Sequence, residues 1–114
     1  IGRSVAHTAK NLKVKTIVAA TESGHTAKMI SKFRPDATIL GVTSTERQQR
    51  ALALIWGVKP VIVDRAKSTD EMFDLCLQAV RDHHTAKEND LVIITAGVPL
   101  GIKGTTNMMK VARL

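Results

Sequence analysis

The chain of 114 residues is poor in several residue types, and each shortage excludes a class of protein. Cys76 is the only cysteine, so neither an internal disulfide nor a cysteine-based metal cluster is expected, and the setting should be reducing and cytoplasmic. Two Phe, one Trp and no Tyr give little material for the aromatic platforms that bind single-stranded nucleic acids. No apolar run approaches the roughly 20 residues of a membrane-spanning helix. We therefore expect neither nucleic acid nor a membrane as a partner.

Apolar residues, in contrast, are plentiful enough for one hydrophobic core. They make up 44% of the chain, which excludes a disordered tail, and the length suits one domain over residues 1–114. The formal net charge of +7 comes from scattered basic residues. It indicates phosphorylated small molecules or an acidic neighbouring domain as partners. A helical pattern begins almost at Ile1, which is not Met, so we expect an excised fragment of a longer chain.

The spacing of apolar residues predicts helices and strands in alternation. Helices are expected over 3–11, 24–33, 45–55 and 69–84, and strands over 16–21, 38–42, 60–63, 91–95 and 107–113. Two capping boxes, TERQ from Thr45 and STDE from Ser68, open the third and fourth helices. The buried face of the first helix is predicted to hold Val5, Ala9 and Leu12, and that of the fourth Met72, Cys76, Ala79 and Val80.

This order of elements predicts an α/β fold. Strands that are separated by helices pair in parallel through right-handed crossovers. The last connection contains no helix, so the final strand should run antiparallel at an edge of the sheet. We therefore predict a three-layer α/β/α domain around a mixed five-stranded sheet whose last strand is antiparallel.

Residues 21–26 (TESGHT) form the most informative candidate site, because they follow the first predicted strand and open the second predicted helix. Ligands of open α/β sheets bind beyond the carboxyl ends of the strands. Backbone N–H groups and the hydroxyls of Thr21, Ser23 and Thr26 can hold a phosphate there, and Gly24 lets the backbone approach closely. From spacing alone, a phosphate cradle and a simple helix cap at Ser23 explain the segment equally well.

The glycine-rich residues 97–104 (GVPLGIKG) form a second candidate site after the fourth predicted strand. Their glycines permit unusual backbone conformations, and Lys103 can face an anion. Without other information, a plain connection to the antiparallel strand is the favoured interpretation.

Other reactive side chains do not suggest a site. The histidines at positions 7, 25, 83 and 84 are too dispersed for a metal site, and adjacent helical histidines point about 100° apart. Cys76 is predicted to be a buried structural thiol. Trp56 is predicted to lie in the core or an interface.

Taken together, six segments resemble the C-terminal domain of pyruvate kinase, in its bacterial form. They are SVAHTA, TIVAATESGHTAKMISKFRP, ILGVTSTE, ALIWGVKPV, STDEM and DLVIITAGVPLGIKGTTNMMKV, and they cover essentially the whole chain in order. The resemblance implies a five-stranded mixed sheet and no catalytic residue. In that family a separate barrel domain transfers a phosphoryl group from phosphoenolpyruvate to ADP in glycolysis, with magnesium and usually potassium. The isolated domain is expected to be inactive and to hold no cofactor.

The resemblance also implies partners and site residues. The C-terminal domain of the family binds an allosteric effector and helps to build a homotetramer, so the expected partners are the catalytic domains of the same chain, further subunits and a phosphorylated effector. The effector-phosphate loop matches Thr21, Ser23, Gly24, His25 and Thr26, and the flexible effector loop matches Gly97, Gly101, Lys103 and Gly104.

Two positions depart from members that respond to fructose 1,6-bisphosphate. Those members often have a lysine at the position of Glu22, and an arginine where this chain has Glu71, Met72 and Phe73. We therefore expect a monophosphate effector such as AMP or ribose 5-phosphate. Two alternatives stay open: a free-standing enzyme that uses Lys103 or His25 as acid or base, and a structural assembly module with a vestigial effector site. In the second alternative, the first and third helices and the last strand carry the contacts.

Overall fold

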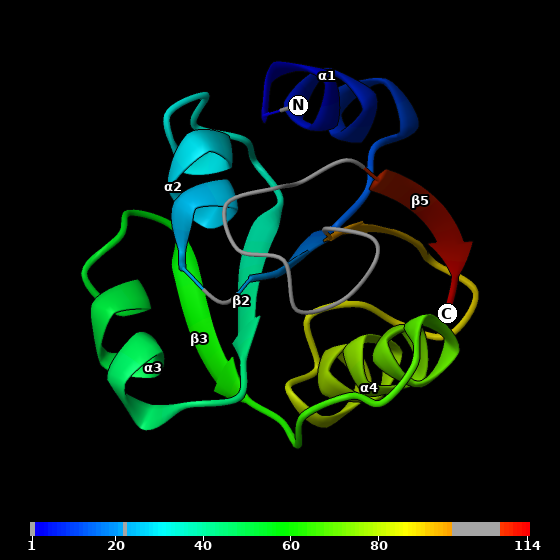
Figure 1. Cartoon of the computed structure of the whole chain (residues 1–114). Helices are drawn as coiled ribbons and strands as arrows, with labels where there is room; N and C mark the ends of the chain where they lie inside the picture. The colour runs from blue at the N-terminus through cyan, green and yellow to red at the C-terminus, as the bar shows by residue number, and fades with distance from the viewer. Residues whose placement is uncertain (1, 22, 97–107) are drawn as a thin grey trace.

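Helices and strands alternate along the chain as far as the fourth strand (Figure 1). The computed structural model describes residues 2–21, 23–96 and 108–114. In chain order the elements are α1 (Gly2–Leu12), β1 (Thr16–Ala20), α2 (His25–Ser31), β2 (Thr38–Thr43), α3 (Glu46–Leu52), β3 (Val58–Ile62), α4 (Thr69–Asp82), β4 (Leu91–Ala96) and β5 (Met108–Arg113).

The strands form one sheet in the order β3-β2-β1-β4-β5. β1 pairs in parallel with both β2 and β4, and β2 pairs in parallel with β3. β5 runs antiparallel beside β4 at the edge of the sheet. The prediction of a mixed five-stranded sheet with an antiparallel last strand is confirmed.

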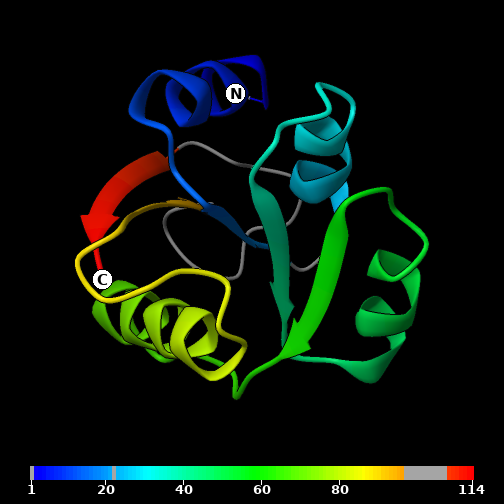
Figure 2. The same cartoon turned by 180° about the vertical axis from the view of Figure 1, so that it is seen from behind.

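Both faces of the sheet are covered by helices, which gives three layers. Alternate residues of a strand point to opposite faces. Ile17, Ile39 and Ile93 pack with residues of α1, α2 and α3, and Val18 and Ile94 pack with α4 on the other face. Figures 1 and 2 show α4 across the sheet from the other helices. The chain thus has a core of its own on each face, as an independently folding domain requires.

Two helices begin where the capping boxes predict. The Thr45 hydroxyl accepts a hydrogen bond from the Gln48 amide at 3.2 Å, and the Ser68 hydroxyl accepts one from the Glu71 amide at 3.1 Å. All four residues predicted for the buried face of α4 are buried, Cys76 completely. Burial raises the pKa of the Cys76 thiol to about 12.

The end of α1 corrects the prediction that Leu12 lies in the core, because its side chain is 42% exposed. Lys13 adopts a left-handed conformation with φ 55°. The Val14 amide then donates to the Ala9 carbonyl and the Lys13 amide to the Lys10 carbonyl, which is the Schellman ending of a helix. Val14 takes the place in the core that was predicted for Leu12.

The helices α2, α3 and α4 end earlier than predicted, and the strands β2, β3 and β4 are each one residue longer. α2 ends at Ser31 and α3 at Leu52, and β3 spans Val58–Ile62 with Pro60 inside it. β3 is an edge strand, where proline is tolerated. Gly57 and Val63 both bond to β2, so the alternation of the ladder directs the Pro60 nitrogen away from β2 and no ladder bond is lost.

Candidate functional site

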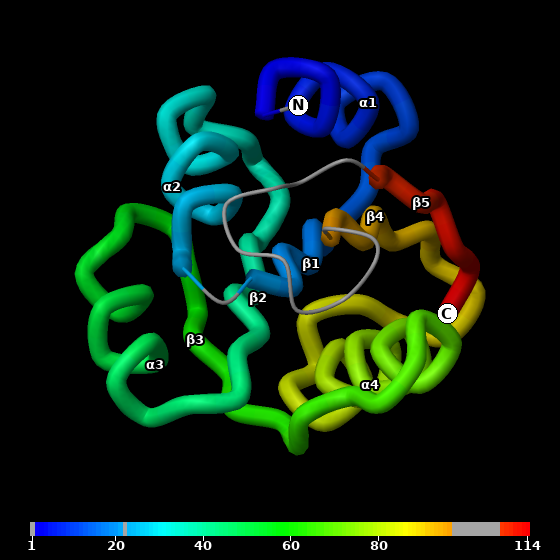
Figure 3. Tube along the Cα trace, viewed as in Figure 1, coloured from blue at the N-terminus to red at the C-terminus, as the bar shows by residue number. Residues whose placement is uncertain are grey.

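The loops after β1 and β4 begin side by side at the carboxyl edge of the sheet. β1 lies between β2 and β4 (Figure 3). The chain leaves β1 toward β2 on one side and returns from β3 to β4 on the other, so the direction of the strand order reverses between β1 and β4. Such a switch point is where open α/β sheets bind ligands. Of the two segments that the sequence singled out, residues 21–26 follow β1 in the chain and residues 97–104 follow β4.

Side-chain hydroxyls in the loop after β1 hold amides of the same loop. The Thr21 hydroxyl accepts hydrogen bonds from the amides of Gly24, at 2.9 Å, and of Ser23, at 3.3 Å. The Ser23 hydroxyl accepts one from the His25 amide at 3.3 Å. Three consecutive amides thus already point at oxygen atoms, and consecutive N–H groups of this kind form anion-binding concavities.

Gly24 gives this loop its shape. It precedes the first residue of α2 with φ 79° and ψ −4°, and no side chain caps the helix at this position. A Cβ at Gly24 would be strained by the left-handed backbone and would lie 3.4 Å from Cδ2 of the buried Leu52. Gly24 and not Ser23 is the N-cap residue, but the exposed Ser23 hydroxyl does accept the amide of His25, the first residue of α2. The phosphate cradle and the simple helix cap therefore both stay predictions.

The other predicted residues of the loop differ in exposure. His25 is exposed and Thr21 is partly buried. Thr26 is only 4% exposed and belongs to the buried side of α2. The predicted role of its hydroxyl toward a ligand stays a prediction. Gly97, Gly101, Lys103 and Gly104 lie outside the described residues, so the predicted effector loop also stays a prediction.

Neighbouring strand ends complete the carboxyl edge. The Thr21 amide donates to the Val42 carbonyl at 3.0 Å, and the Val63 amide donates to the Thr43 carbonyl at 2.9 Å. Thr43 is buried and Ser44 partly buried. The described part of this edge therefore offers hydroxyls and amides, which recognise an anion without contributing a charge. Over the described ranges no group of three or more His, Cys, Asp or Glu side chains is placed to hold a metal ion.

Comparison with known families identifies the chain's relatives. The family described as "Pyruvate kinase, alpha/beta domain" matches residues 1–112. This chain belongs to that family. The resemblance found in the sequence segments is thereby confirmed. None of the helices in the described ranges is long and apolar enough to cross a bilayer.

Curated pyruvate kinases match the domain over nearly its full length. The chain is similar to the enzymes of Lactobacillus delbrueckii subsp. bulgaricus, at 54% identity over 110 residues, and of Staphylococcus haemolyticus, at 56% over 110 residues. Each match covers 96% of this chain and 19% of the relative. The chain therefore spans about a fifth of the length of these relatives.

A solved structure agrees with the fold. The crystal structure of a pyruvate kinase from Cryptosporidium parvum matches with a TM-score of 0.86 at 28% identity. The match covers 99% of this chain and 22% of that one. The two structures thus share the same α/β fold over nearly all of this chain.

The start of α4 holds the residues at which the resemblance led us to look for an arginine. Met72 is buried in the core, and Phe73 is partly buried with the Lys110 ammonium 4.2 Å from its ring centroid. The first turn thus carries the carboxylates of Asp70 and Glu71 and no guanidinium. Sequence spacing could not have found the Lys110 contact, since β5 reaches α4 only through the folded sheet. Glu22 lies outside the described residues.

Proposed function

We propose that this chain is the regulatory and assembly domain of a pyruvate kinase, and that its carboxyl edge binds the phosphate group of an allosteric effector. The parent enzyme would transfer a phosphoryl group from phosphoenolpyruvate to ADP with residues outside this domain. One observation carries the effector site: three amides at the β1–β4 switch point already have oxygen acceptors, the hydroxyls of Thr21 and Ser23.

Phosphate binding at this loop needs little rearrangement of the backbone. A phosphate oxygen is a stronger acceptor than a hydroxyl, since charge-assisted hydrogen bonds are roughly twice as strong as neutral ones. It would replace the hydroxyls as the acceptor for the amides of Ser23, Gly24 and His25. The freed hydroxyls of Thr21 and Ser23 would then turn and donate to the same phosphate.

A ligand with one phosphate suits this edge best. Glu22 adds a carboxylate to the loop sequence, and the start of α4 has Glu71, Met72 and Phe73 in place of a basic residue. Both features disfavour a second phosphate. AMP and ribose 5-phosphate are therefore favoured over fructose 1,6-bisphosphate, and Lys103 and the glycines of 97–104 would close over the ligand.

The metals of the parent enzyme would lie elsewhere. Magnesium is bound through carboxylates and substrate phosphates, and over the described residues no group of three or more His, Cys, Asp or Glu side chains is placed to hold it. Magnesium and potassium would both be bound by the catalytic domains of the same chain. The buried free thiol of Cys76 supports a reducing, cytoplasmic location.

Titration calorimetry tests the effector site. Ribose 5-phosphate and AMP should bind more tightly than fructose 1,6-bisphosphate. The Thr21→Val/Ser23→Ala variant should bind at least roughly tenfold more weakly, because hydrogen bonds to a charged group contribute about 1.5–3 kcal/mol each. Ser23→Ala/Thr26→Ala tests the buried hydroxyl in the same way.

Ser68→Ala is the matched control for these variants, since it also removes a hydroxyl that holds a helix amide. It should lower stability by about 1 kcal/mol and leave the affinity unchanged. If the loop variants bind both monophosphates as well as the unmodified chain does, the site assignment is wrong.

A second role, in assembly, is favoured by exposed apolar side chains. Leu54 is 89% exposed and Trp56 is 53% exposed, in the connection between α3 and β3. Exposed apolar surface of this kind marks protein interfaces. We propose that it contacts another domain or subunit of a homotetramer. Sedimentation velocity tests self-association of the domain, and a monomer at all concentrations would argue against a dominant assembly role.

A further inference from the structure

A groove of about 740 Å³ lies at the opposite, amino-terminal edge of the sheet. It runs between α1 and the segment that joins α2 to β2. Val14 and Lys15, just before β1, and Asp36 and Ala37, just before β2, contribute to its lining. Its size is within the roughly 300–1,000 Å³ of small-molecule pockets.

Basic side chains dominate the lining of this groove. They are Arg3, Lys10, Lys13, Lys15 and Arg34, and the only carboxylate among the lining residues is Asp36. With His7 neutral, five positive charges and one negative charge give the lining a formal charge of +4. Two ion pairs of the described residues join Glu46 to Arg50 and Arg81 to Glu88, and none of these four residues lines the groove. The groove thus concentrates more than half of the chain's excess positive charge.

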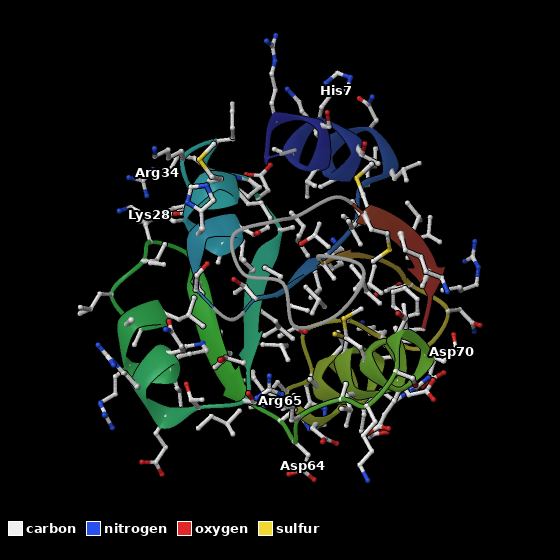
Figure 4. The ribbon with its side chains drawn as sticks, viewed as in Figure 1. His7, Lys28, Arg34, Asp64, Arg65 and Asp70 are labelled. Atoms are coloured by element: carbon white, nitrogen blue, oxygen red, sulfur yellow. The ribbon has the colours of Figure 1, made fainter. Side chains whose placement is uncertain are left out.

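Two of these basic residues stand in unfavourable backbone conformations. Lys13 has φ 55° and Arg34 has φ 47°. Lys13 ends α1 at the position of the Schellman motif that glycine usually occupies, and its side chain lines the groove. Arg34 also stacks its guanidinium 4.3 Å from the centroid of the Trp56 ring, which fixes its direction. Figure 4 shows His7 on α1 and Arg34 beyond α2.

The groove also has an apolar part. Phe33 is 47% exposed, and Ala6 and Pro35 line the groove beside it. An aromatic ring at this position can stack on a flat ligand group. Charged walls and an apolar patch together suit an organic anion better than a bare inorganic one.

We propose that this groove is a second anion site, separate from the carboxyl edge, for a small organic ligand that bears two or more phosphate groups. A terminal phosphate carries about −1.5 to −2 charges at neutral pH, so a diphosphate, or two separate phosphate groups, comes close to the excess charge of the lining. The lysines and arginine would hold the phosphates, and Phe33 the organic part.

Uridine 5′-diphosphate and pyrophosphate are suitable probes for calorimetry and amide NMR on the 114-residue chain. We expect uridine 5′-diphosphate to bind roughly two- to tenfold more tightly than pyrophosphate, through stacking on Phe33. Amide resonances of 10–15 and 33–37 should shift. Both affinities should fall steeply with salt, because fixed charges at an open site are screened. Shifts confined to 21–26, or tighter binding of an acidic peptide or of anionic vesicles, would overturn the proposal.

Lys10→Gln/Lys15→Gln should weaken uridine 5′-diphosphate binding at least roughly tenfold. The matched control, Lys59→Gln/Lys87→Gln, removes the same charge from exposed positions outside the groove and should change the affinity less than twofold. Thr21→Val/Ser23→Ala should leave it unchanged. Equal losses in the two lysine variants would show general attraction to a basic protein and contradict a site.

A pair of glycine variants separates binding from folding. Lys13→Gly and His84→Gly both replace a left-handed residue at the same position of a Schellman ending, since Thr85 and His84 repeat the hydrogen bonds of Val14 and Lys13. Both variants should raise Tm by relieving strain. Only Lys13→Gly should weaken binding, by roughly fivefold or more. If Lys13→Gly keeps full affinity, the role assigned to this residue is wrong.

Discussion

The two edges of the parallel sheet offer an anion two different environments. At the carboxyl edge, the described loop presents the hydroxyls of Thr21 and Ser23 and the amides they hold. At the amino edge, the groove presents lysines and arginines on an apolar base. Neutral dipoles that are already oriented select for shape, whereas flexible charges select for total charge. If both proposed sites bind, one domain would distinguish a monophosphate from a more highly charged ligand by position.

The support beneath the edges differs as well. Leu52 is fully buried, and a Cβ added at Gly24 or Gly41 would meet its side chain at 3.4 or 3.0 Å. The carboxyl-edge loop therefore rests on a side chain of the core. The amino-edge groove is lined by α1 and by the segments before β1 and β2, and its lysine side chains are exposed.

Of the substitutions considered, Leu52→Ala should have the largest effect, and it should affect binding at the carboxyl edge only. Removing the buried side chain should lower the free energy of unfolding by about 2–5 kcal/mol, through lost burial and the cavity left under Gly24. The folded fraction should lose affinity for ribose 5-phosphate but keep its affinity for uridine 5′-diphosphate. Urea denaturation measures the first effect and calorimetry the second. Leu54→Ala, at an exposed leucine, is the control and should change stability by less than about 0.5 kcal/mol.

Alkaline pH should lower the stability of the whole domain, and so affect both edges together, because it acts on the core that they share. Burial raises the pKa of the Cys76 thiol from 9.0 to about 12. Above pH 9 the unfolded chain releases this proton and the folded chain retains it, so stability that is complete below pH 9 is lost toward pH 12. The loss should approach about 1.4 kcal/mol per pH unit. Urea denaturation of the unmodified chain and of Cys76→Ala checks this, and equal pH slopes would contradict it.

Gly24→Ala should give a smaller effect that is confined to one edge. Forcing a side chain into the left-handed conformation costs about 1–2 kcal/mol, and contact with Leu52 adds to it. Gly57→Ala is the control, because Gly57 has φ 71° but nothing within 4 Å of an added Cβ. Thermal unfolding should show the larger loss for Gly24→Ala. Only that variant should weaken ribose 5-phosphate binding. Equal binding by both variants would show that Gly24 has no role in the proposed site.

Much of the fold could be predicted because local signals agreed with one another. Capping boxes at Thr45 and Ser68 placed two helix starts, and buried apolar runs placed the parallel strands. The errors arose where tertiary context decided. Because of the Schellman turn at Lys13, Val14 and not Leu12 lies in the core. Because β3 is an edge strand, it can continue on both sides of Pro60.

The two proposed sites were not equally visible in the sequence. Residues 21–26 are contiguous, so their pattern marked a candidate site before the fold was known. The groove residues come from α1, from the turn before β1 and from the α2–β2 segment, and no spacing rule joins Lys10 to Arg34. Trp56, predicted to be a core or interface residue, is half exposed beneath the Arg34 guanidinium. Only the folded sheet brings these positions together.

Pro60 has a further consequence for the behaviour of the chain at high concentration. An open sheet edge is a template on which foreign strands add and aggregates grow. The Pro60 nitrogen faces the open side of β3 and carries no hydrogen, so an incoming strand finds a missing donor in the middle of that edge. Lys59 adds charge to the same strand. The domain is thereby protected against uncontrolled polymerisation along one side of its sheet.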